Sequence, residues 1–148
     1  MKNKLFHWLA ANKVLLEVLL VSLSAATYFL IRHQVIKDQG LFMFFMTTLA
    51  TFYFLSAYLP MELKGLLEII AMKVVGISSA VSIIGLQFHL LGLTGGGQMM
   101  VIGGTSLGFA GVILLISWIQ SRNIILVPLL LRIAILSPIV LFVFSGQT

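Results

Sequence analysis

Five mostly apolar runs, each long enough to cross a lipid bilayer, occupy nearly the whole sequence. A transmembrane helix needs roughly 20 such residues. The runs are 14–31, 40–59, 70–93, 98–119 and 124–145. Because lipid offers the backbone no hydrogen-bond partners, such runs must be helical, and no period-2 alternation typical of a membrane barrel occurs. The sequence therefore predicts an all-α polytopic membrane protein, with five transmembrane helices and short loops, forming one integral membrane domain over residues 1–148.

Composition excludes a water-soluble fold. Hydrophobic residues make up 60% of the 148 residues and charged residues only 9%. A soluble domain of this size still exposes roughly a third of its unfolded surface, which is too much for so apolar a chain. Cysteine is absent, which removes disulfides and thiol metal sites from consideration.

The loop charges predict the orientation of the chain in the plasma (inner) membrane. Six positive residues lie on one side and two on the other if the helices alternate in direction. The six are Lys2, Lys4, Lys13, Lys64, Lys73 and Arg122, and the two are Arg32 and Lys37. The positive-inside rule then places the N-terminus in the cytoplasm and the C-terminus outside. Residues 1–13 are expected to form an interfacial cytoplasmic segment, and the net charge of +5 favours anionic membrane lipids as partners, with no nucleic acid.

Arg132 is the charge that lies deepest in an apolar run. Counted from residue 124 at 1.5 Å per residue, it sits about 12 Å from the cytoplasmic end, while Glu17 lies about 5 Å deep in the first run. Helical side chains lean toward the helix N-terminus, which lowers the arginine toward the level of the glutamate. The sequence therefore predicts an intramembrane charge pair between Glu17 and Arg132.

Other interpretations of these charges stay open. Arg132 can reach the interface with its long side chain, or bond the Ile124 carbonyl that Pro128 leaves without a donor. Intramembrane charges also suggest a transport or proton pathway. The residues that could complete a polar path with the charge pair are Ser78, Ser82 and His89.

Small residues predict helix-packing faces in the third and fourth runs. Gly76 and Ala80 are four residues apart, and Gly104, Gly108 and Gly111 follow at spacings of four and three. In lipid, such small-residue faces let helix backbones approach closely. We expect these faces to pack within the fold or against a second subunit.

The hairpin of the third and fourth runs resembles the transmembrane hairpin of GldL, a subunit of the rotary motor that drives gliding motility and type nine secretion. The resemblance covers roughly residues 72–119, and its matching positions are Gly76, Gly85, Phe88, Leu93, Thr94, Gly95, Gly96, Met100, Ile102 and Gly103. In that family the second helix carries a glutamate that couples ion flow, and Leu107 stands at the matching position here. The resemblance therefore implies a shared packing unit without the motor activity.

Catalysis is not expected. The four acids and three histidines are scattered over different depths, and no nucleophile, metal-ligand or cofactor pattern appears. We therefore predict a protein that is not an enzyme, has no cofactor or metal, and acts as a structural or accessory subunit of a membrane complex through helix packing. Its partners are then other transmembrane subunits or further copies of itself. A small oligomeric transporter or channel, with a polar path near Glu17 and Arg132, is the alternative; its substrate is not indicated.

Overall fold

The computed structural model describes residues 11–35, 38–59, 65–122 and 124–145, and every regular element in these ranges is helical. The elements are α2 (Lys13–Arg32), α3 (Gly40–Ser56), α4 (Leu66–Leu90), α5 (Gly96–Ser121), the short 3₁₀ helix η1 (Ile124–Leu126) and α6 (Val127–Ser145). The predicted all-α class is confirmed for this part of the chain. Most of the predicted interfacial segment 1–13 falls outside the described residues, as do Lys2, Lys4, Lys37 and Lys64.

Four helical segments in the described ranges are long and apolar enough to cross a membrane. They are Lys13–Arg32, Leu66–Leu90, Gly96–Ser121 and Ile124–Val143. The remaining helix, α3, is apolar but has only 17 residues, a length of about 25 Å at 1.5 Å per residue. The fold is therefore that of a helical membrane protein with four helices of full spanning length and one shorter helix.

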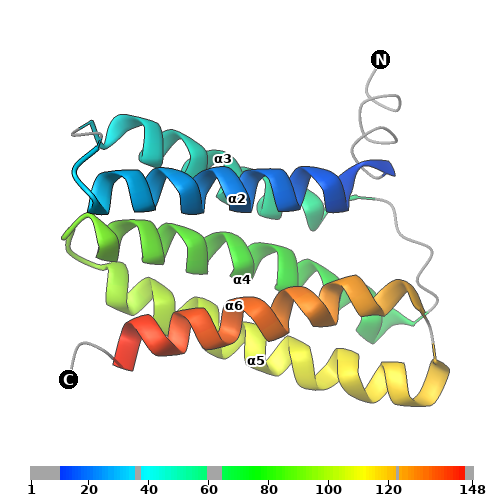
Figure 1. Cartoon of the computed structure of the whole chain (residues 1–148). Helices are drawn as coiled ribbons and strands as arrows, with labels where there is room; N and C mark the ends of the chain where they lie inside the picture. The colour runs from blue at the N-terminus through cyan, green and yellow to red at the C-terminus, as the bar shows by residue number, and fades with distance from the viewer. Residues whose placement is uncertain (1–10, 36–37, 60–64, 123, 146–148) are drawn as a thin grey trace.

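The five long helices run alternately in opposite directions along one bundle (Figure 1). α2, α4 and α6 begin at the end of the bundle where α3 and α5 finish. α4 is the central helix, since it packs most extensively on α5 and also contacts α3 and α6. α2 packs mainly on α3 and leaves most of its surface open. This arrangement brings the start of α2, the end of α3 and the start of α6 to one end of the molecule.

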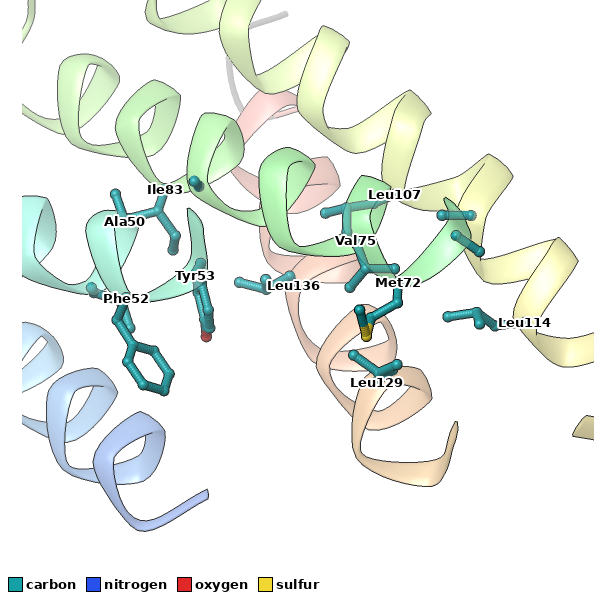
Figure 2. Close-up of a cluster of buried hydrophobic side chains, with 14 of the residues drawn as sticks. Ala50, Phe52, Tyr53, Met72, Val75, Ile83, Leu107, Leu114, Leu129 and Leu136 are labelled. Carbon is teal, nitrogen blue, oxygen red and sulfur yellow. The ribbon is translucent and has the colours of Figure 1, made fainter. Parts of the chain in front are cut away.

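The hydrophobic core follows α4 along its contacts with α3, α5 and α6 (Figure 2). Val75 of α4, Leu107 of α5 and Leu129 of α6 are buried there. Many large apolar side chains instead point outward, and Phe109 and Phe142 are more than three quarters exposed. Such outward apolar surface is favourable only in contact with lipid or with another apolar surface.

The third predicted run, 70–93, differs from the helix that the structure contains. α4 begins at Leu66 and ends at Leu90. Its end is a Schellman motif, in which Gly92 has a positive φ of 69° and the Leu93 amide donates to the Phe88 carbonyl at 2.8 Å. Glu68 lies in its first turn, where a carboxylate is favoured by the helix dipole. The capping interactions at its two ends therefore place the helix a few residues earlier in the sequence than the apolar run predicts.

Candidate functional site

Glu17 of α2 and Arg132 of α6 form a bidentate ion pair. Arg132 Nε donates to Glu17 Oε1 at 2.8 Å, and Arg132 Nη2 donates to Glu17 Oε2 at 2.8 Å. The two residues are 115 positions apart in sequence, and Arg132 is only 8% exposed. Two parallel bonds between a guanidinium and a carboxylate fix the orientation of both groups as well as their distance. The structure thus brings together the two residues that the sequence predicts to pair.

α3 supplies further contacts to the same guanidinium. Arg132 Nη1 donates to the Ser56 hydroxyl at 3.0 Å, and this hydroxyl donates in turn to the Tyr53 carbonyl at 2.7 Å. The guanidinium carbon lies 4.5 Å from the centre of the Tyr53 ring, within the range of a cation–π contact. Tyr53 belongs to the same buried cluster as Leu136 of α6, and both are labelled in Figure 2. Arg132 therefore joins three helices, and within the described ranges its side-chain hydrogen bonds go to Glu17 and Ser56, and not to the Ile124 carbonyl.

Ser56 and Tyr53 were not identified from the sequence. They are three residues apart near the end of the second apolar run, and therefore share one face of α3. In an antiparallel bundle, the end of that run lies near the start of α6, the helix that carries Arg132. A search for polar groups at matching depths would have found both residues.

A small hollow adjoins the ion pair at the end of the bundle. Its cavity volume is about 20 Å³, and it is lined by Lys13, Val14, Glu17, Ser56, Leu59, Pro128, Leu129 and Arg132. A volume of this size accommodates about one water molecule. Lys13 is half-buried there, one helical turn before Glu17. We call this feature the α2–α6 hollow.

The residues of the predicted polar path lie in the interface between α4 and α5. Ser78 and Ser82 are buried, and His89 is half-buried. A Cβ added to Gly103 of α5 would collide with the Ser82 hydroxyl and lie 2.8 Å from the Ser82 amide nitrogen, so the two backbones are in close contact. None of these three residues is among the hydrogen-bond partners of Glu17 or Arg132 in the described ranges. The structure therefore does not join them to the charge pair.

Two serine hydroxyls of α4 have no hydrogen-bond partner within the part of the chain that the structure describes. They belong to Ser79 and Ser82, and both residues are fully buried. Their small side chains suit the tight packing around α4. On α2, by contrast, the hydroxyls of the buried Ser24 and Thr27 donate hydrogen bonds to the backbone carbonyls four residues earlier, at 2.8 and 2.9 Å.

The predicted packing glycines have different environments. Gly76 is in tight contact with Ala57, since an added Cβ would lie 2.7 Å from the Ala57 Cβ, and Ala80 is buried. Gly104 and Gly111 face α6, where an added Cβ would lie 3.3 Å from Val140 and 3.2 Å from Ile133. Gly108 has no atom within 4 Å of an added Cβ. The predicted three-glycine face therefore packs within the described chain at its two ends only.

The closest approach of α4 and α5 uses glycines that the packing prediction omitted. An added Cβ on Gly85 would lie 2.8 Å from the Met100 amide nitrogen, and one on Gly96 would lie 2.7 Å from the His89 amide nitrogen. Gly103 is the third of this set. Gly96 and Gly103 are seven residues apart, which is two helical turns, so they share one face. This seven-residue spacing is the sequence pattern from which the packing face of α5 could have been predicted.

Comparison with known proteins gave no match to a family model, to a curated protein or to a solved structure. The resemblance of the α4–α5 hairpin to GldL stays a prediction.

Proposed function

We propose that this protein is a structural or accessory subunit of a membrane complex and that it acts through helix packing. The observation that carries the proposal is the internal pairing of Glu17 with Arg132. A transport pathway requires a charge that can change partners, whereas this arginine has three hydrogen bonds and an aromatic contact inside the chain. The charge of Arg132 therefore stabilises the packing of three helices. The outer apolar surface of the bundle remains available for partner helices.

The proposal includes five membrane crossings. α2 and α4 are both of spanning length, and both begin at the same end of the bundle (Figure 1). The chain between them must return across the same thickness, and α3 is the helix that makes this return. A length of about 25 Å is close to the hydrocarbon thickness of a bilayer. Local thinning of the bilayer or polar flanking residues can accommodate the small difference.

The proposed orientation has the N-terminus in the cytoplasm of a cell with an inner membrane. The charged residues described at the end where α2 begins include Lys13, Lys73 and Arg122, which outnumber the one unpaired acid, Glu68, besides the neutral Glu17–Arg132 pair. At the opposite end, Arg32 is offset by Asp38. An excess of positive charge at one end favours that end as the cytoplasmic one.

The outer face of α5 is the proposed contact surface for a partner helix. Gly108 is open there, and Val112, one turn later on the same face, is 59% exposed. A glycine at the centre of an apolar helix face permits the close backbone approach on which helix association in lipid depends. The partner is a transmembrane helix of another subunit or of a second copy.

Site-specific crosslinking in native membranes tests this proposal with a matched control. A photo-crosslinking residue at Val112 of α5 should give a discrete protein adduct. The same residue at Val18 of α2, which is 61% exposed, should give mainly lipid adducts. Equal behaviour of the two positions would contradict a partner on α5. Loss of an ion flux in Glu17→Gln, with normal protein abundance, would favour a transporter or channel instead.

A further inference from the structure

The α2–α6 hollow contains a cation that the ion pair does not use. Glu17 is engaged by both Nε and Nη2 of Arg132. Lys13, on the same wall of the hollow, forms no ion pair with any residue in the described ranges. Two cations and one carboxylate leave the hollow with a net charge of +1. The half-buried ammonium of Lys13 shares the single carboxylate of Glu17 with Arg132, and this excess of positive charge favours an anion at the site.

The shape of the hollow restricts that anion. With room for about one water molecule, it is too small to enclose a phosphate group. A phosphate can therefore bind only at the mouth of the hollow, at the exposed part of the half-buried Lys13 side chain. Apart from the three charged residues and Ser56, the lining is apolar and consists of Val14, Leu59, Pro128 and Leu129. The site thus combines a cationic mouth with apolar flanks.

The outer surface beside the mouth favours a ligand with an apolar body. Val14 of α2 is 54% exposed, and Leu15 beside it is 65% exposed. An acyl chain can lie along these side chains while its headgroup reaches Lys13. Free inorganic phosphate would make no use of them.

We propose that the α2–α6 hollow is a binding site for an anionic phospholipid, whose phosphate binds Lys13 and whose acyl chains lie against the adjoining apolar surface of α2. The site requires insertion in a membrane, but not the accessory role proposed above. It differs from a general attraction between a basic protein and an acidic leaflet, because it depends on one lysine at one hollow.

Native mass spectrometry of the full chain in mild detergent tests the site. The probes are phosphatidylglycerol, phosphatidylcholine with the same acyl chains, and inorganic phosphate. We expect preferential retention of phosphatidylglycerol. Loss of the charge-assisted contact in Lys13→Gln should weaken that retention by about tenfold, and Lys13→Arg should restore most of it.

Lys73→Gln is the matched control, because it removes the same charge from an exposed position of α4 near the same end of the bundle. It should weaken retention by no more than about a fewfold, the value of one juxtamembrane charge. Equal losses in the two Gln variants would overturn the site in favour of general attraction. Equal retention of the two lipids would contradict the proposal that the ligand is an anionic phospholipid. Displacement of phosphatidylglycerol by millimolar phosphate would contradict it as well. Unchanged helical circular dichroism checks that Lys13→Gln is folded.

Discussion

Glu17 and Arg132 join the first described helix of the bundle to the last through two hydrogen bonds of 2.8 Å. Apart from this pair, α2 packs mainly on α3, and its exposed face is the most open of the four spanning helices. Without the ion pair, α2 would be held mainly by its packing on α3. The ion pair adds a direct link between α2 and α6. Arg132 also contacts Ser56 and Tyr53 of α3, so it would keep polar contacts if α2 moved away.

The first prediction concerns the energetic coupling of the pair. Removing one partner strands the other charge, at a cost of about 3–5 kcal/mol when the site is dry, and less when water enters through the hollow. Glu17→Leu and Arg132→Leu should each lower the free energy of unfolding in detergent or bicelles. The double variant should recover much of the loss, since neither charge is then left alone. Strictly additive losses in the double-mutant cycle would contradict an energetic role for the pair.

A second prediction concerns the contacts of Arg132 with α3. Ser56→Ala removes the acceptor of Arg132 Nη1 and should cost about 1.5–3 kcal/mol, as for a hydrogen bond to a charged group. Tyr53→Leu should cost more, since it removes both the cation–π contact and a fully buried ring. Tyr53→Phe keeps the ring and is the control for the aromatic contact. If Tyr53→Phe and Tyr53→Leu were equally destabilised, the ring would not be the important feature of this residue.

The glycines of α5 provide a third prediction. Gly103→Ala should destabilise the chain by about 1–3 kcal/mol, because the new methyl group meets the Ser82 hydroxyl and the α4 backbone. Gly108→Ala meets open space and should be neutral or slightly stabilising, as alanine is the better helix former. Thermal unfolding of the two variants in one detergent compares them directly. Equal destabilisation would show that the packing difference between the two positions is absent in solution.

The helical class and the charge pair were both predicted from the sequence, although the sequence left other partners for Arg132 open. Both follow from rules that act along one helix: apolar length, the rise per residue, and the lean of side chains toward the N-terminus. Because α2 and α6 are parallel, depth alone brings Glu17 and Arg132 to the same level. The pair could be predicted without knowing which helices are neighbours.

The packing faces were harder to predict, because they depend on which helices meet and at what rotation. Gly103 and Gly108 are both glycines in one apolar run, yet only Gly103 faces Ser82. Periodicity showed that small residues share a face but not which neighbour that face contacts. The end of α4 was likewise set by the left-handed conformation of Gly92, which hydropathy does not register.

The last prediction concerns topology and tests the crossing made by α3. Reporter fusions after Gln39, Gly65, Gly96 and Ser121, and at the C-terminus, should alternate between the two sides of the membrane. Gly65 and Ser121 should report the cytoplasm, while Gln39, Gly96 and the C-terminus should report the outside. Removing positive charge by Lys13→Gln together with Lys73→Gln should weaken this bias, since the orientation depends on basic residues flanking the membrane. If Gln39 and Gly65 reported the same side, α3 would not cross, and the bundle would have four transmembrane helices with α3 lying against them.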